Sequence, residues 1–453
     1  MPATNSEDDQ HRLETPHLES TVLSHGHILH SLVAKPNGHP SDLLVGFANP
    51  ADHHHATART FFNCAVGRYA NRLPSGEIKL ATGAKIHASG AEGVCLHGGE
   101  SGFDTLPWTP IPRSESSLFD VDDPQHTVPP PPSDPAAPIT ESTTLHRLYS
   151  PAGADGFPCS LEVEALVTVL APKVEETEAE GRKGRSVGKV KVVFRAKIRE
   201  DGDEGIDKGT PVNLTLHWGF RLDDCKDPDV LGHRLFLASD KLVALDDLGL
   251  STGEIDAVEK GSQYDFYSSG LDGEHRTIGE QYDQEKGIDR NFLFNTPPPS
   301  LHHPSGSARL STTPQAILTS PTSAAHPYQL RFTSNQPSVQ VYTAAGLDGS
   351  GPARKEAHGG PSEAAAKEGQ PGAVEGRGYG KHGAVFLEFH APVGAVVHAA
   401  SASGKEETPL GAWLAERAEV RKADEEGRGW ERDTVLRRGQ VYENWVECEV
   451  LAV

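Results

Sequence analysis

The sequence lacks the long apolar run that a membrane-spanning helix needs. No stretch approaches the ~20 consecutive apolar residues required to cross a bilayer, and hydrophobic residues make up 36% of the 453 positions. The first ten residues, MPATNSEDDQ, are polar and lack the apolar core of a signal peptide. We therefore expect a soluble protein of the cytoplasm with no membrane partner.

Cysteine is scarce and shows no pattern. The chain has an odd number of cysteines, with no C-x-x-C pair: Cys64, Cys95, Cys159, Cys225 and Cys448. This spacing indicates neither a disulfide framework nor a thiolate zinc site. Reduced thiols are the simplest interpretation.

Positive charge is also in deficit. The chain has 42 Lys and Arg against 64 Asp and Glu, a formal net charge of −22, which argues against binding to a nucleic acid backbone. No P-loop or paired metal-ligand motif is present, so we expect neither a nucleotide nor a metal cofactor. His53, His54 and His55 are consecutive and point in different directions, so we interpret them as a solvated loop rather than a metal site.

What the sequence does contain is short segments with a period of two, which is typical of strands with one buried face. The alternation is clear in Leu161–Val169, in Val192–Ile198 and in Tyr442–Val450. The last of these suits an antiparallel sheet that is wet on one side. Many such segments predict an all-β fold, a large antiparallel β-sandwich.

One helix is expected, with Thr408 as N-cap and Pro409 at its first position, and we interpret it as surface decoration. Four segments rich in Pro, Gly, Ala or charge interrupt the strand pattern and are predicted to be flexible loop insertions: 124–138, 173–189, 296–327 and 348–382. Strand-like sequence resumes after each insertion. We therefore predict a single domain over residues 1–453, with an ordered core at roughly 20–452.

Several polar motifs recur in a fixed order among the strands. They are Gly67–Arg72, Leu96–Asp104, Ser150–Pro158, Val212–Trp218, Gly287–Phe292, Ser338–Thr343, Ala384–Glu388 and Leu436–Tyr442. Together they resemble the motifs of the aldose 1-epimerase, or galactose mutarotase, family across roughly Asp42 to Val450. The resemblance implies the galactose mutarotase-like β-sandwich and a cofactor-free enzyme acting on a small sugar.

By this resemblance Glu388 is the general base on the anomeric hydroxyl and His217 the general acid at the ring oxygen. Unperturbed pKa values of ~4.3 and ~6.5 suit these roles near neutrality. His97 would be a second imidazole on the ring-oxygen side. Asn71, Arg72, Asp289 and Gln340 would bind sugar hydroxyls or orient the substrate. We expect Glu388 and His217 to face one cavity, separated by roughly the width of a pyranose ring.

Each of these residues also has a structural interpretation. His217 beside Trp218 could be a core histidine, and Glu388 a sheet-edge or partnered carboxylate, because unpaired burial is costly. Arg72 could be a structural cap or form a surface ion pair, and Asp289 could belong to an Asx turn. The glycines after His97 suggest close approach of the backbone to a ligand, or only a turn.

The chain also departs from the family pattern. Leu216 precedes His217, Gly219 replaces a usual tyrosine, and Phe389 and His390 replace the Pro-Gln that usually follows the glutamate. These changes motivate a non-catalytic sugar-binding or sugar-sensing protein as an alternative. Arg290 replaces a usual histidine and motivates a hexose-6-phosphate 1-epimerase. The preferred sugar and the choice between monomer and dimer stay open.

Overall fold

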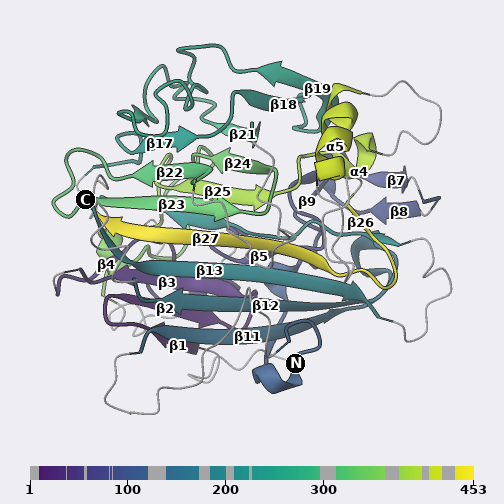
Figure 1. Ribbon diagram of the computed structural model, residues 1–453, viewed down its shortest axis with the longest axis horizontal. Helices are drawn as coiled ribbons and strands as arrows, with labels where there is room; N and C mark the ends of the chain where they lie inside the picture. The colour runs from purple at the N-terminus through teal and green to yellow at the C-terminus, as the bar shows by residue number, and fades with distance from the viewer. Residues whose placement is uncertain are drawn as a thin grey trace.

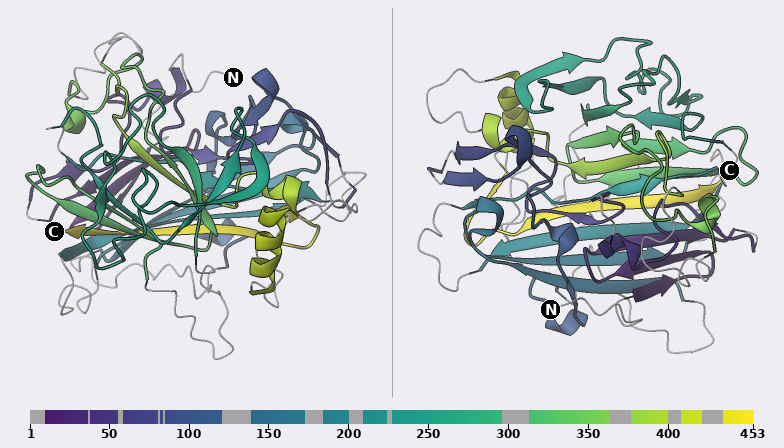
Figure 2. Two further views of the ribbon diagram at one scale, coloured as in Figure 1. Left: turned by 90° about the horizontal axis from the view of Figure 1, so that it is seen from above. Right: turned by 180° about the vertical axis from the view of Figure 1, so that it is seen from behind.

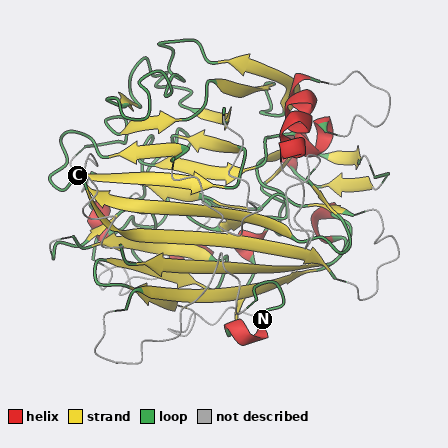
Figure 3. Cartoon of the chain, viewed as in Figure 1, coloured by secondary structure: helices red, strands yellow, loops and turns green. Residues whose placement is uncertain are grey.

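Strands dominate the computed structural model of the protein, as Figure 3 shows. The structure describes residues 10–36, 38–55, 59–80, 82–83, 85–120, 139–172, 184–199, 209–223, 227–295, 313–362, 377–399, 408–420 and 434–453. The ladders of its two largest sheets are antiparallel. The prediction of an all-β antiparallel sandwich is confirmed.

The largest sheet has nine strands, and β27 lies between β13 and β23 near its middle (Figure 1). In spatial order the strands are β10 (Thr109–Pro110), β11 (Glu141–Ser150), β12 (Leu161–Leu170), β13 (Arg185–Ile198), β27 (Tyr442–Ala452), β23 (Tyr328–Ser334), β22 (Ala316–Thr319), β17 (Arg234–Leu237) and β20 (Arg276–Thr277).

A six-stranded sheet carries the later motifs. Its spatial order is β16 (Trp218–Phe220), β25 (Val385–His390), β24 (Ser338–Tyr342), β21 (Asp289–Leu293), β18 (Lys241–Leu245) and β19 (Ser251–Ala257). A four-stranded sheet contains β1 (Gln10–Glu14), β2 (Leu18–Leu23), β3 (Ile28–Ala34) and β4 (Ser41–Asp42). Strand β1 thus begins at Gln10, before the predicted start of the ordered core at roughly residue 20.

Short strand pairs and helices complete the described chain. The pairs are β15 (Thr215–Leu216) with β5 (Ala65–Val66), β6 (Arg72–Pro74) with β9 (Val94–Leu96), β7 (Gly76–Lys79) with β8 (Lys85–Ala88), and β14 (Thr210–Pro211) with β26 (Val435–Leu436). The α-helices are α1 (Asp52–His55), α4 (Ala395–His398) and α5 (Pro409–Val420). The 3₁₀ turns are Ala91–Gly93, Phe103–Thr105, Arg113–Glu115, Ala154–Gly156 and Glu356–His358.

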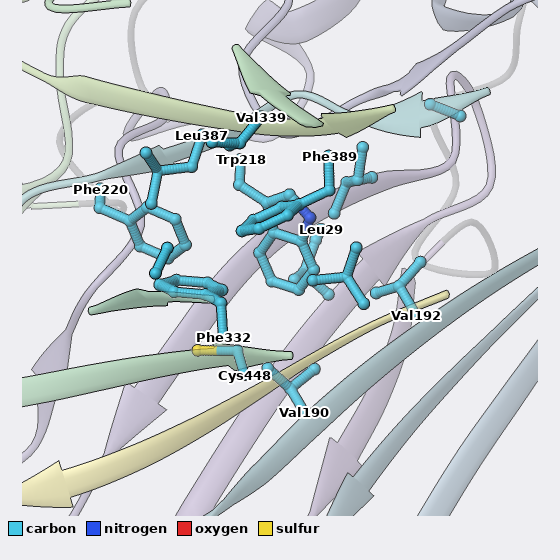
Figure 4. Packing of buried hydrophobic residues seen from close by; sticks show 14 of the residues in the cluster. Leu29, Val190, Val192, Trp218, Phe220, Phe332, Val339, Leu387, Phe389 and Cys448 are labelled. Atoms are coloured by element: carbon cyan, nitrogen blue, oxygen red, sulfur yellow. The ribbon is translucent and has the colours of Figure 1, made fainter. Parts of the chain in front are cut away.

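The main core lies between the nine-stranded and six-stranded sheets. Figure 4 shows Trp218, Phe332 and Phe389 packed together, with Val190 and Cys448 on the side of the large sheet. Side chains alternate between the two faces of a strand. Because Leu387 and Phe389 of β25 point into this core, Glu388 is on the opposite face of the same strand.

The outer face of the nine-stranded sheet is more buried than the alternation of the sequence predicted. Arg195 and Glu443 form an ion pair of 2.7 Å with side chains 1% and 2% exposed. Arg195 also donates to the carbonyl of Leu118 and stacks on Phe119, while Glu164 accepts from Ser117 and Arg147. The segment that contains Leu118 and Phe119 covers this part of the sheet, so the prediction of a wet face is wrong there.

The helix begins where it was expected, but it is not surface decoration. The Thr408 hydroxyl accepts from the Gly411 amide at the start of α5, as an N-cap does. Leu410 and Leu414 are 0% exposed and belong to a cluster with Leu293 and Val393. Figure 2 shows α5 at the edge of the strands in the view from above.

The four predicted insertions fare differently. Residues 124–138 lie outside the described residues, as do 173–183, 296–312 and 363–376. The loop prediction is wrong for Arg185–Lys189, which begins β13, and for Ala316–Thr319, which forms β22. The ends of the last insertion pack into the protein: Lys355 is 6% exposed and pairs with Asp42. The single-domain assignment stays a prediction.

Across the described helices, none has the length and apolar character required to traverse a bilayer.

Candidate active site

Three titratable side chains meet on the outer face of the six-stranded sheet. Nitrogen and oxygen atoms of His97, His217 and Glu388 lie within 4.8 Å of one another. Nε2 of His217 is 3.3 Å from Oε1 of Glu388, and their side chains are 6% and 3% exposed. We call these three residues the proton-transfer cluster.

Strand register brings the glutamate beside the other polar residues. Asn291 of β21 pairs with Gln340 of β24, and Gln340 pairs with Glu388 of β25. Directly opposed residues share one face of a sheet, so these three side chains form a row. Asp289, two residues before Asn291, belongs to the same face.

The backbone of the chain before β6 fixes the position of His217. The amide of His217 donates to the carbonyl of Cys64, and the amide of Asn63 donates to the carbonyl of His217. The imidazole lies between two aromatic rings, 5.8 Å from that of Phe61 and 4.8 Å from that of Phe386. These contacts keep the ring next to Glu388.

His97 is oriented by the main chain of Asn71. The amide of Asn71 donates to Nδ1 of His97 at 3.2 Å, and the amide of His97 donates to the carbonyl of Asn71. A neutral imidazole that accepts at Nδ1 carries its proton on Nε2. His97 therefore presents an N–H donor, at 5.3 Å between ring centroids from His217.

Three residues form a hydrogen-bonded group toward the more exposed end of the site. Arg72 Nη2 donates to Oδ2 of Asp289 at 3.1 Å, and Gln340 Nε2 donates to Oδ1 of the same carboxylate at 2.6 Å. The side chains of Arg72 and Asp289 are 26% and 37% exposed. Exposure thus falls from this hydrogen-bonded group to the proton-transfer cluster, which suits a polar ligand that enters from the arginine side.

Asn71 is engaged with its neighbours in the chain. Its side-chain oxygen accepts from the Arg72 amide at 2.9 Å, and its residue is 3% exposed. These contacts make Asn71 a residue that orients His97 and Arg72. Binding of a sugar hydroxyl by its amide nitrogen stays a prediction.

Burial sets the protonation of the cluster. It raises the pKa of Glu388 to about 8, with a further increase from Asp289 that Arg72 opposes. Burial lowers the pKa of His217 to about 3 and that of His97 well below its usual range. Between these limits Glu388 and His217 together hold one proton.

The spacing of Glu388 and His217 corrects the expectation of a full pyranose width between them. The anomeric hydroxyl and the ring oxygen of an aldopyranose are bonded to the same carbon. An acid and a base that act on these two oxygens therefore have to stand close together, as the 3.3 Å contact allows.

The cluster has the composition of a two-histidine, one-carboxylate metal site. A metal at Nε2 of His97 would require the proton on Nδ1, but Nδ1 accepts from the Asn71 amide. This tautomer suits a hydrogen-bond donor better than a metal ligand. We assign no metal to the cluster.

The glycines after His97 pack the early motifs against one another. A Cβ on Gly98 would lie 2.2 Å from the Gly67 carbonyl oxygen, and one on Gly99 would lie 2.7 Å from an Asp155 carboxylate oxygen. The close approach at these glycines is to the protein backbone and to Asp155. Their φ values of +88° and +101° fit a tight turn, and approach of the backbone to a ligand stays a prediction.

The family departures have local explanations. A Cβ on Gly219 would lie 2.5 Å from the Phe386 ring, so that ring occupies the space beside His217. Phe389 packs in the core with Phe332, and His390 is on the face of Glu388. Despite these replacements, His97, His217 and Glu388 still lie close to one another.

Arg290 does not reach the site. It pairs in register with Val341, a core residue, and so belongs to the face of β21 opposite Asp289. Its guanidinium donates to Asp256 at 3.1 Å and lies over the Tyr264 ring. The residue that motivated a phosphorylated substrate is thus engaged elsewhere.

Sequence reasoning missed several residues around the site. The Asn291 amide atoms and Nε2 of His390 are buried and have no hydrogen-bond partner among the described residues. A Cβ on Gly249, in the turn between β18 and β19, would lie 2.9 Å from Cδ of Arg72. Asn291 lies in the Gly287–Phe292 motif but was given no role. Gly249 carries no signal in a single sequence, and His390 stood out only as a departure from the family.

The histidine tract is not a solvated loop. His53 and His54 are in α1, and Nδ1 of His54 is 2.5 Å from Nδ1 of His25. Both residues line a cavity of about 230 Å³ that also contacts Arg59 and Phe61. Phe61 lies between this cavity and the rings of His97 and His217.

Comparisons with known proteins agree with this fold. A family model described as aldose 1-epimerase matches residues 9–175 and 187–377. Galactose mutarotase of Rattus norvegicus is 26% identical over 356 residues, 77% of this chain and 81% of the relative. Aldose 1-epimerase of Escherichia coli is 24% identical over 268 residues, 59% of this chain and 62% of the relative.

Solved structures show the same fold. The GalM/aldose epimerase homologue from C. elegans aligns with a TM-score of 0.62 at 16% identity, over 98% of this chain and 99% of the other. Galactose 1-epimerase from Lactobacillus acidophilus aligns with a TM-score of 0.60 at 15% identity, over 100% and 98%. The protein therefore has the galactose mutarotase-like sandwich. By the match of the family model, the chain belongs to the aldose 1-epimerase family.

Proposed function

We propose that this protein is an aldose 1-epimerase that interconverts the α and β anomers of an aldohexose such as glucose or galactose. The observation that carries the proposal is the buried contact between Nε2 of His217 and Oε1 of Glu388, at 3.3 Å. Family relatives named galactose mutarotase and aldose 1-epimerase support the reaction class.

In the proposed reaction, the Glu388 carboxylate takes the proton of the anomeric hydroxyl while protonated His217 delivers a proton to the ring oxygen. The bond between C1 and the ring oxygen breaks, and an open-chain aldehyde forms. Rotation about the C1–C2 bond and reversal of both proton transfers close the other anomer. No atom or charge is gained, and the pair again holds one proton.

The resting proton favours Glu388, because burial raises the pKa of this carboxyl to about 8 and lowers that of His217 to about 3. Transfer of this proton from Glu388 to His217 gives the reactive pair of carboxylate and imidazolium. We expect kcat/KM to be highest where the pair holds one proton and to fall above about pH 8.

The other residues take binding roles in this proposal. His97 keeps its proton on Nε2 and donates a hydrogen bond to the sugar on the ring-oxygen side. Arg72, Asp289 and Gln340 exchange their mutual hydrogen bonds for sugar hydroxyls. Charge-assisted hydrogen bonds of this kind are the stronger ones, which suits binding of a neutral polyol.

The test is polarimetry of freshly dissolved α-glucose and α-galactose, with and without the protein. We expect acceleration by the wild type and a loss of about 10²–10⁴-fold in kcat in both Glu388→Gln and His217→Asn. Equal rates with and without wild-type protein would refute the proposal for these sugars. Binding of the sugar without acceleration would support the sugar-sensing alternative.

A matched variant tests the phosphorylated alternative. Arg290→Ala removes a guanidinium that pairs with Asp256 on the opposite face of β21. We expect it to leave the rates with glucose and with glucose 6-phosphate unchanged. A selective loss with the phosphate ester would instead place Arg290 in substrate binding.

A further inference from the structure

His390 is a third imidazole beside the proton-transfer cluster. It is 0% exposed and is two residues from Glu388 in β25, so both side chains project from the same face of the strand. Its positive charge, were it present, would act on both His217 and His97. The cluster and His390 therefore share one buried environment.

The tautomer of His390 is fixed by its own backbone. Nδ1 lies 2.6 Å from the carbonyl oxygen of Ala391, and only a protonated nitrogen can donate there. Nε2 then carries a lone pair and can only accept a hydrogen bond. Within the described chain this atom has no hydrogen-bond partner, and a buried acceptor of this kind needs a donor.

Glu388 offers the complementary atom. Its Oε1 faces Nε2 of His217, whereas its Oε2 is buried and has no hydrogen-bond partner among the residues described. A carboxyl that holds a proton donates one hydrogen bond from the protonated oxygen. When Glu388 is protonated at Oε2, it thus has a hydrogen-bond donor to offer, and Nε2 of His390 is an acceptor that lacks one.

We propose that His390 is a positioning residue whose Nε2 accepts, through one bridging water molecule, the hydrogen bond of the Oε2 hydroxyl of Glu388. The contact holds the proton on Oε2 in the resting protein. It leaves Oε1 toward His217 and the substrate. Buried waters commonly join polar groups in this way.

Other charged groups act on Glu388 from each side, and their effects can be separated from that of His390. Asp289 of β21 raises the pKa of Glu388 and Arg72 of β6 lowers it. His217 contacts Oε1, and His97 lies behind His217. None of these groups changes when His390 is replaced.

Two substitutions of His390 test the contribution of the lone pair on Nε2. Asn in place of His390 can keep the donor toward Ala391 but has no atom at the position of Nε2, whereas Gln places an amide oxygen near that position. We expect His390→Asn to move the alkaline limb of kcat/KM down by about one pH unit, because the protonated carboxyl loses its acceptor. His390→Gln should restore the limb.

Ser338→Ala is the matched control. The Ser338 hydroxyl donates to the backbone carbonyl of His390 at 2.6 Å, so its removal disturbs the strand without touching the imidazole. We expect the limb of this variant to stay at the wild-type pH. A limb that is unchanged in His390→Asn, or a rise in KM with no movement of the limb, would overturn the proposal.

An infrared readout keeps the test independent of turnover. The inference rests on the proposed function only for the kinetic arm. The carboxyl band of Glu388, identified by subtraction of Glu388→Gln, should disappear at lower pH in His390→Asn than in the wild type. Equal titration in both proteins contradicts the role of His390, whereas absence of mutarotation with a shifted band contradicts only the proposed reaction.

Discussion

The two faces of strands β24 and β25 in the six-stranded sheet are about equally buried but differ in chemistry. Val339, Leu387 and Phe389 on the inner face are 0% exposed and pack in the main core. Gln340 and Glu388 on the outer face are 1% and 2% exposed, and each has a polar atom with no hydrogen-bond partner among the described residues. Since unsatisfied burial is costly, the outer face gives up stability for a polar site.

Neighbouring residues of β25 allow the most direct test of this difference. We expect Glu388→Gln to reduce kcat by about 10²–10⁴-fold, because the base is lost, with no loss of stability. Leu387→Ala should instead cost about 2–5 kcal/mol of unfolding free energy, because it leaves a cavity in the core. Polarimetry and urea unfolding of both variants measure the two effects. A strongly destabilised Glu388→Gln would show that the carboxyl is structural.

The pH dependence of stability sharpens the same contrast. Burial raises the pKa of Glu388 to about 8 in the folded protein. The folded protein therefore binds this proton more tightly than the unfolded chain does. This contribution is fully present below about pH 4.5 and is lost as pH rises to about 8. We expect the stability advantage of Glu388→Gln over wild type to grow by roughly 2–4 kcal/mol between pH 5 and 8.

The opposite sign is expected for His217. Burial lowers its pKa to about 3, so its contribution is lost as pH falls from about 6.5 toward 3. Urea unfolding of His217→Asn and of wild type across this range provides the control. Parallel curves for wild type, Glu388→Gln and His217→Asn would contradict the assigned protonation states.

A smaller effect is expected at the more exposed end of the site. Asp289→Asn removes one acceptor shared by Arg72 and Gln340 and the negative charge near Glu388. We expect KM to rise about tenfold, the value of one charge-assisted hydrogen bond, and the alkaline limb to move to lower pH. Initial-rate polarimetry over a range of sugar concentrations measures both.

Asp256→Asn is the control for this carboxylate. It breaks the ion pair with Arg290 on the opposite face, where the Asp256 side chain is 54% exposed and such pairs contribute little. KM should stay at the wild-type value. An equal rise of KM in both variants would mean that net charge, rather than hydrogen bonding at Asp289, controls sugar binding.

Sequence patterns predicted the inner face of the nine-stranded sheet better than its outer face. The period of two in β12, β13 and β27 identified core positions. The resemblance of the motifs pointed to His97, His217 and Glu388, whose side chains meet in the structure. The burial of Glu443 was missed, because its cover comes from Leu118 and Phe119 far away in the chain. Burial of this kind depends on tertiary contacts that alternation along one strand does not encode.

Composition was a poor guide for the same reason. The Gly- and Ala-rich stretch that contains Lys355 was predicted to be flexible, yet Lys355 donates to Asp42 and to the carbonyl of Leu44. Its partners lie more than 300 positions earlier. The role of His390 likewise required the position of its ring nitrogens relative to Ala391 and Glu388, which a single sequence cannot supply.

The smallest expected effect concerns the turn that supports Arg72. Gly249 has a φ of +74°, and an added Cβ would lie 2.9 Å from Cδ and 3.1 Å from Nε of Arg72. Gly249→Ala should displace the guanidinium and raise KM about two- to fivefold, with a cost of about 1–2 kcal/mol from the left-handed backbone. Gly261 has a φ of +81° and open space around it, so Gly261→Ala should show the stability loss alone. If both variants leave KM unchanged, the turn does not position Arg72 for the sugar.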